Sequence, residues 1–187
     1  PYGKAATFWD VLGGGSGPAG RAAGLTAGRS GARVILWEQD ALTGGRLRAE
    51  HLDIEGRPAS QWADETIQSL SAMPEVRILT RTCVFGTYDG GTYGALERVS
   101  DHISTPETDT PRQRLWRIVA RRCIVATGGI ERPIASPNNA LPGIMLARSV
   151  LTHINPIGVA AAQPATAHPI HANGSRPPPP PFRPAWP

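Results

Sequence analysis

The stretch that decides the fold is Gly15-Ser16-Gly17-Pro18-Ala19-Gly20, which has the pattern G-x-G-x-x-G. A predicted strand over residues 8–12 and a glycine-rich turn over 13–17 precede it, and a predicted helix over 18–29 follows. The first glycine of this pattern permits a tight turn, the second lets the backbone approach a pyrophosphate, and the third lets the helix pack against the strand. Free N–H groups and the positive end of the helix dipole then face the phosphates.

The residues after the motif complete a βαβ unit. The predicted helix ends near Ser30-Gly31, and a strand over residues 33–37 follows at once and closes with Glu38. Strand, helix and strand within about 30 residues form the crossover that builds parallel sheets. Glu38 lies eighteen residues after Gly20, where an acidic side chain accepts hydrogen bonds from ribose hydroxyls and repels a 2′-phosphate. The pattern therefore favours NAD or FAD over NADP. A glycine-rich turn beside a solvated glutamate, with no ligand, stays open as the alternative.

Gly13 and Gly14 stand where the first strand of this unit normally carries bulky apolar residues. Glycine in a strand removes side-chain packing and adds a cost in backbone entropy. We therefore expect the first strand to be the least stable element of the sheet.

The rest of the chain predicts one α/β, Rossmann-like domain over residues 1–158, with a parallel sheet and a small β meander. Trp62, Ile67 and Leu70 give a helical period over 60–73, and Trp62 and Trp116 are expected to anchor a core or an interface. Cys83 and Cys123 sit in apolar runs and are predicted to be two buried thiols. The further expected elements are a loop at 44–46, strands over 76–80, 115–119 and 123–126, a strand or meander leading into a short helix over 82–99, and a helix over 144–154. Residues 159–187, which include Pro177–Pro181, are predicted to form a disordered or polyproline tail.

Composition and motifs argue against several other functions. The net charge is +4, but the arginines are scattered along the chain, so no nucleic-acid partner is predicted. Neither a leader nor an apolar run of membrane-spanning length stands out, so we expect a cytoplasmic protein without a membrane partner. The five histidines lack metal-ligand spacing, and no G-x-S-x-G sequence indicates a hydrolase. No catalytic residue and no metal ligand is predicted.

A second motif lies further along the chain. Ile124-Val125-Ala126-Thr127-Gly128-Gly129 resembles the apolar run followed by Ala-Thr-Gly of flavoproteins that bind two dinucleotides. In those proteins the strand returns to the first sheet, and its glycines pass close to the cofactor. Gly128 is therefore a further candidate for cofactor binding.

Several segments with no role in a general dinucleotide motif point to a narrower family. Residues 81–89, 92–99, 111–116 and 130–133 resemble the alpha subunit of heterotetrameric sarcosine oxidase, and the resemblance covers about residues 10–158. It implies a non-covalent NAD in this domain, FAD on the beta subunit, covalently held FMN between the two, and beta, gamma and delta subunits as partners. The implied reaction oxidises the N-methyl group of sarcosine to give glycine and peroxide, with tetrahydrofolate accepting the one-carbon unit.

The resemblance also assigns residues to the NAD site. Gly15, Gly17, Ala19 and Gly20 would contact the pyrophosphate and Glu38 the adenosine ribose, while the same pocket would be lined by Gln39, Asp40, Gly45, Arg46 and Val84. The family usually has an acidic residue at the position of Gln39 and a small one at that of Arg46. It also continues beyond Gly158 into another nucleotide-fold strand and a folate-binding domain, which implies that this chain is incomplete and inactive alone.

Three alternatives stay open. FAD could occupy the N-terminal site, as in related pyridine-nucleotide reductases. The chain could belong to another amine or amino-acid oxidase or dehydrogenase. It could also be a non-catalytic scaffold or an aberrant translation product.

Overall fold

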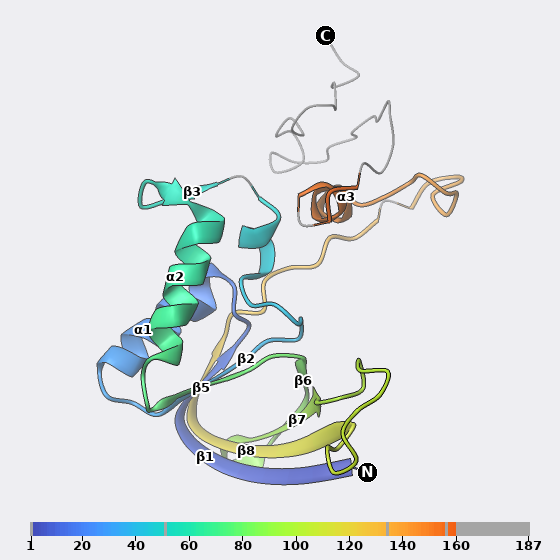
Figure 1. Ribbon diagram of the computed structural model, residues 1–187. Coiled ribbons are helices and arrows are strands. Elements are labelled where there is room, and N and C mark those ends of the chain that lie inside the picture. The colour runs from blue at the N-terminus through green and yellow to red at the C-terminus, as the bar shows by residue number, and fades with distance from the viewer. Residues whose placement is uncertain (1, 51, 134, 156, 160–187) are drawn as a thin grey trace. The chain divides into compact units, whose positions relative to one another are not determined.

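The computed structural model describes residues 2–50, 52–133, 135–155 and 157–159 (Figure 1). Its contacts divide the chain into a first unit, Pro1–Leu47 with Leu52–Gly128, and a second unit, Arg48–His51 with Gly129–Pro187. The predicted tail over 159–187 lies outside the described residues except for Val159, so it remains a prediction.

A six-stranded sheet in the order β5-β2-β1-β8-β7-β6 forms the centre of the first unit. The first four strands of this order run parallel to one another, and β7 and β6 continue the sheet as antiparallel strands. The α/β fold with a parallel sheet and a β meander is thereby confirmed. The strands are β1 (Tyr2–Gly14), β2 (Val34–Trp37), β5 (Val76–Leu79), β6 (Thr82–Tyr88), β7 (Thr92–Arg98) and β8 (Gln113–Val125).

Strands β1 and β8 are longer than the sequence predicted. The two are paired in parallel from Tyr2 with Gln113 to Gly14 with Val125. The strand predicted over 8–12 therefore includes Gly13 and Gly14, and their prediction as part of the turn was wrong. The two strands predicted over 115–119 and 123–126 are one strand, because pairing with β1 carries the ladder through the polar residues between them.

The side chains of β2 cover the positions that the two glycines leave empty. A Cβ built on Gly13 would lie 2.9 Å from Leu36 Cδ1, and one built on Gly14 would lie 3.0 Å from Trp37 Cζ2. Gly13 and Gly14 are both buried, as is the whole of β2. The space that larger side chains would occupy is therefore filled from the neighbouring strand.

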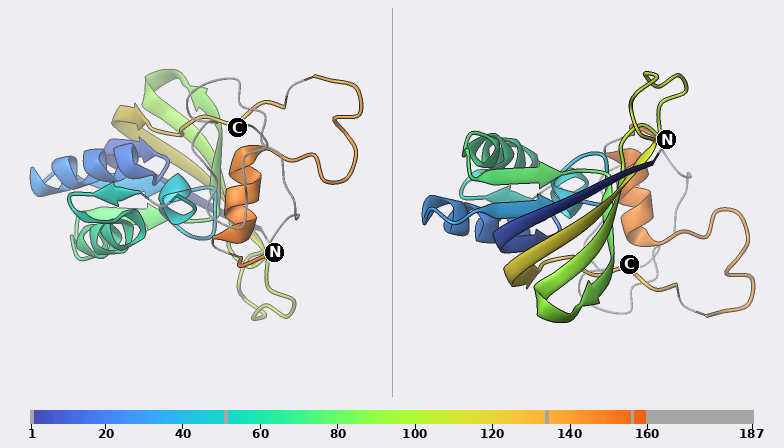
Figure 2. Two further views of the ribbon diagram at one scale, coloured as in Figure 1. Left: turned by 90° about the horizontal axis from the view of Figure 1, so that it is seen from above. Right: turned by 90° about the horizontal axis from the view of Figure 1, so that it is seen from below.

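Helices α1 (Pro18–Arg29) and α2 (Ala59–Ser71) lie side by side on one face of the parallel strands (Figures 1 and 2). The bounds of α1 are those predicted, with Pro18 in the first turn, where a missing N–H does no harm. A Cβ built on Gly24 of α1 would be in ordinary contact with Leu70 of α2, at 3.4 Å. The buried residues of α2 are Ala59, Ala63, Thr66 and Leu70, while Trp62 and Ile67 are half-buried.

The other face of the parallel strands is covered by the sheet itself, because β1 and β8 bend and bring the meander over it (Figure 1). Leu12 and Ile35 form one core cluster with Trp116 and Ile118. The ring of Trp37 lies 6.3 Å from that of Tyr93, measured between centroids. Trp116 is 4% exposed, which confirms it as a core anchor.

The cysteines and the hairpin differ from expectation. Cys83 is exposed, because side chains alternate along β6 and it lies on the opposite face from the buried Thr82 and the half-buried Val84. The prediction of two buried thiols was therefore wrong for this residue, and Cys123 is half-buried. Burial raises the pKa of the Cys123 thiol. The segment expected to be a meander leading into a short helix, residues 82–99, contains β6, a 3-10 turn (Asp89–Gly91) and β7. The structure of these residues therefore does not include the short helix that was expected at their end.

Shorter elements complete the described chain. The loop expected at 44–46 contains a 3-10 helix, Gly45–Arg48, and a small ribbon of β3 (Asp53–Ile54) and β4 (Arg57–Pro58) precedes α2. In the second unit, α3 (Ala147–Ile154) begins three residues later than predicted. Within the described ranges, no helix is long and apolar enough to cross a bilayer.

Candidate dinucleotide site

The loop between β1 and α1 requires glycine at two positions for structural reasons. Gly15 has φ +93°, and a Cβ there would lie 2.5 Å from the Ala126 carbonyl oxygen at the end of β8. A Cβ on Gly20 would lie 1.9 Å from the Gly15 carbonyl oxygen. The first turn of α1 therefore packs directly on the loop, as the motif predicts.

Gly17 has a different environment. A Cβ built on Gly17 would meet no atom within 4 Å, so the space in front of it is open. Gly17 immediately precedes α1, whose first turn contains no acidic side chain. Pro18 has no N–H, and the N–H groups of Ala19 and Gly20 lie in a first turn that offers them no intrahelical acceptor. Open space, free donors and the positive helix end are the properties that a phosphate group requires.

Glu38 lies beside this loop, at the end of β2. Its side chain is largely buried, with the residue only 8% exposed. Oε2 accepts hydrogen bonds from the Ser16 hydroxyl and from the Ser16 N–H, the latter at 3.1 Å. Oε1 accepts one from the Asp40 N–H, also at 3.1 Å. The carboxylate is therefore directed to the turn between β1 and α1.

Two further residues of this network had no role in the sequence analysis. Ser16 is fully buried; its hydroxyl accepts a hydrogen bond from the Gly44 N–H at 3.2 Å, and its carbonyl accepts one from Arg21 Nε at 2.7 Å. The Arg21 guanidinium is also fully buried and donates to the Ala63 carbonyl of α2. A buried cation needs such acceptors. The sequence feature that could have indicated the role of Arg21 is its position: it is a charged residue directly after Gly20, on a helix that must pack against the sheet.

The remaining predicted residues lie at different distances from the loop. A Cβ on Gly45 would lie 3.6 Å from Gly17 Cα, which brings the 44–46 segment next to the turn before α1. Gln39 and Asp40 are exposed directly after Glu38, and Arg46 is exposed within the 3-10 helix. Gly128, with φ +73°, is exposed shortly beyond the end of β8.

Val84 follows Thr82 by two residues, and the Thr82 N–H donates to the Glu38 carbonyl at 2.8 Å, so the start of β6 lies beside the end of β2. Val84 itself lies on β6, half-buried, and packs against the main core cluster. The structure thus brings together Gly15, Gly17, Gly20, Glu38 and Gly45, with the end of β8 beside them. Glycines that leave room for a pyrophosphate, next to a carboxylate held at the turn, fit an adenosine dinucleotide.

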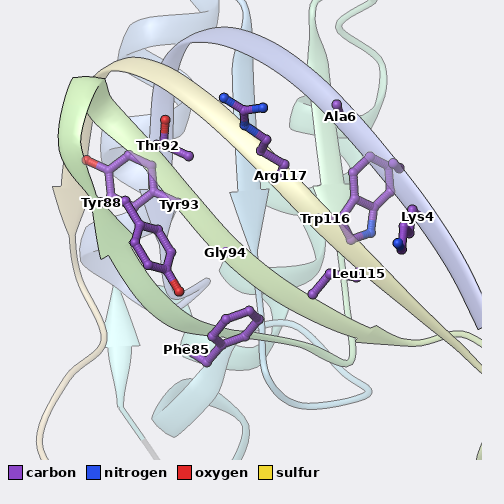
Figure 3. Close-up of a pocket in the computed structure, with 11 residues that line it drawn as sticks. Lys4, Ala6, Phe85, Tyr88, Thr92, Tyr93, Gly94, Leu115, Trp116 and Arg117 are labelled. Carbon is purple, nitrogen blue, oxygen red and sulfur yellow. The ribbon is translucent and has the colours of Figure 1, made fainter.

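A hollow of about 510 Å³ lies elsewhere, on the outer face of β6, β7, β8 and β1 (Figure 3). Phe85 and Tyr88 lie beside Gly94 there, and both are more than half exposed. None of the predicted site residues lines this hollow. No group of three or more His, Cys, Asp or Glu residues in the described part of the chain could hold a metal ion.

Comparison with known proteins found close similarity to one kind of subunit, although no family model matches the chain. The chain is 45% identical over 159 residues to the alpha subunit of sarcosine oxidase from Rhizobium meliloti (strain 1021), covering 85% of this chain and 16% of that protein. It is also 45% identical over 154 residues to the alpha subunit from Corynebacterium sp. (strain P-1), covering 81% and 16%. A weaker match, 27% identical over 166 residues, is to one subunit of opine oxidase from Agrobacterium tumefaciens (strain Ach5), covering 84% and 31%. The chain thus spans about a sixth of the length of the sarcosine oxidase subunits that it matches.

Solved structures agree on the fold. L-proline dehydrogenase from P. horikoshii superposes with a TM-score of 0.71 at 23% identity, over 87% of this chain and 31% of that one. Thioredoxin reductase from Lactococcus lactis gives a TM-score of 0.51 at 20% identity, over 71% and 39%. These likenesses show the fold alone. The 45% identity shows that this chain is similar to one region of the sarcosine oxidase alpha subunit, and the solved structures show its fold.

Proposed function

We propose that the chain binds NAD at the turn between β1 and α1. The observation that carries this proposal is the open space in front of Gly17 beside a carboxylate that is held at the same turn. The pyrophosphate would lie over Gly17 and accept hydrogen bonds from the N–H groups of Ala19 and Gly20. Glu38 would accept a hydrogen bond from the adenosine ribose.

The same carboxylate supports discrimination against NADP. A 2′-phosphate would lie next to the largely buried Glu38 carboxylate, which would repel it. The resemblance to the sarcosine oxidase alpha subunit favours NAD over FAD in this site. FAD remains the second candidate, because it has the same adenosine diphosphate half, and a visible flavin spectrum in the purified protein would favour it.

We further propose that the chain serves a hetero-oligomeric amine oxidase, with sarcosine as the substrate and beta, gamma and delta subunits as partners. A bound nicotinamide or flavin would supply hydride transfer, and the protein would supply binding and orientation. We expect this region to supply no acid or base for amine oxidation. We therefore expect the chain alone to produce no peroxide from sarcosine.

Calorimetric titration of the purified chain with NAD, NADP and FAD tests the proposal. We expect NAD to bind at one site and NADP to bind at least tenfold more weakly, a difference of about 1.4 kcal/mol. In the Gly17→Ala variant the new methyl group would occupy the space for the phosphate, so binding should be lost while the far-ultraviolet circular dichroism stays unchanged. Absence of binding by any dinucleotide, or wild-type affinity in the variant, would contradict the proposal.

A further inference from the structure

The hydrogen bonds around Glu38 leave it few free acceptor positions. A carboxylate has about four, two on each oxygen. The Ser16 N–H and the Ser16 hydroxyl take both positions on Oε2, and the Asp40 N–H takes one of those on Oε1. One position on Oε1 is left for a ligand.

Ser16 itself cannot reach a ligand, because it is fully buried. Its hydroxyl donates a hydrogen bond to the Glu38 carboxylate and accepts one from the Gly44 N–H at 3.2 Å. The hydroxyl therefore joins three segments: the turn before α1, the end of β2, and the loop that carries Gly45 next to Gly17. Removing this one oxygen would take away one of the three hydrogen bonds to the carboxylate and the hydrogen bond to the Gly44 loop.

We propose that Ser16 is a positioning residue that holds Glu38 so that its carboxylate accepts a hydrogen bond from a single ribose hydroxyl. This inference rests on the proposed function, since it concerns the sugar end of the same dinucleotide site. It deepens that function by stating how the sugar is held: through Oε1 alone, with Oε2 reserved for the protein. It also assigns a role to a motif position that the pattern G-x-G-x-x-G leaves unspecified.

The first experiment uses the wild-type chain and ADP, which is the part that NAD and FAD share. Affinities for ADP, 2′-deoxy-ADP and 3′-deoxy-ADP are measured by calorimetry. We expect one of the two analogues to bind about tenfold more weakly than ADP and the other to bind within twofold of it. Equal weakening of both analogues, or of neither, would overturn the inference.

The second experiment is a double-mutant cycle with Ser16→Ala and Glu38→Gln. We expect Ser16→Ala to weaken ADP binding about fivefold, to leave the binding of the weaker analogue unchanged, and to have no further effect in the Glu38→Gln background. A merely structural role of Ser16 would instead weaken all three ligands alike, and that result would overturn the inference.

Ser100 provides the matched control. It too is fully buried, and its hydroxyl donates to the Pro111 carbonyl at 3.1 Å, in a loop that contributes no residue to the site. Ser100→Ala should lower the melting temperature without changing the ADP affinity. If Ser16→Ala fails to fold, the analogue experiment on the wild-type chain still decides. Failure of the wild-type chain to bind ADP would reject the proposed function, whereas binding with equal loss for both analogues would reject only the role of Ser16.

Discussion

At the scale of single residues, Asp10 shows how one carboxylate connects three strands. Asp10 Oδ2 accepts hydrogen bonds from the Arg33 N–H and from Arg33 Nε, both at 3.1 Å, just before β2. Arg121 of β8 approaches Asp10 Oδ1 at 3.7 Å. The hydrogen bonds from Arg33 hold the pKa of Asp10 below its ordinary value. A lowered pKa in the folded state stabilises the protein above the pKa of the unfolded chain, and this contribution is lost as the pH falls through the folded pKa.

Asp10→Asn should therefore lower the melting temperature at pH 7, and its difference from wild type should shrink as the pH falls through the ordinary range of aspartate. Thermal melts at several values between pH 7 and pH 3 would measure this. Asp89→Asn is the matched control, because no ion pair is found for Asp89 among the described residues, and its melting temperature at pH 7 should stay close to that of wild type. Identical melts of Asp10→Asn and wild type at every pH would contradict the prediction.

The residue scale also shows what sequence reasoning can recover from this site. The place of Glu38 beside the turn follows from its spacing, because the ends of parallel strands meet at one edge of a sheet. The roles of Ser16 and Arg21 do not follow from spacing, since the motif leaves the position of Ser16 unspecified and ends before Arg21. Their burial and their hydrogen bonds depend on segments 22 to 42 residues away, which no local pattern contains.

At the scale of elements, the contact between α1 and the turn before it determines which glycines the fold needs. Gly20→Ala would place a methyl group against the backbone oxygen of Gly15, so α1 would have to shift. We expect a loss of about 1–3 kcal/mol in the free energy of unfolding, measured by urea denaturation. Gly24→Ala, one turn further along α1, is the control: its Cβ would be in ordinary contact with Leu70, and alanine favours a helix over glycine by about 1 kcal/mol. A stability loss in Gly24→Ala as large as that in Gly20→Ala would refute this assignment.

The elements also differ in how well local sequence predicts them. The bounds of α1 agree with the prediction, because Pro18 and the Ser30-Gly31 pair mark its two ends locally. The lengths of β1 and β8 do not agree, because each is continued by pairing with the other over positions that look polar or glycine-rich on their own. Strand length in this sheet is thus a property of the pair, which a single segment does not reveal.

At the scale of the whole molecule, the first unit is closed by strands from the two ends of its sequence. Strand β8 lies between β1 and β7 and pairs with both, so it connects the parallel strands to the meander. It also carries Trp116 and Ile118 into the core cluster that contains Leu12 and Ile35. The stability of the first unit should therefore depend on β8 far more than on residues after it.

Two shortened chains test this dependence. A chain that ends at Gly128 keeps the whole first unit, and we expect it to unfold cooperatively and to bind ADP with the affinity of the full chain. A chain that ends at Arg112 lacks β8, which would expose Leu12 and Trp37 and leave β1 and β7 without their shared partner. We expect this second chain to show no cooperative transition by circular dichroism or calorimetry. Two results would contradict this dependence on β8: a cooperative transition in the chain that ends at Arg112, or the lack of one in the chain that ends at Gly128.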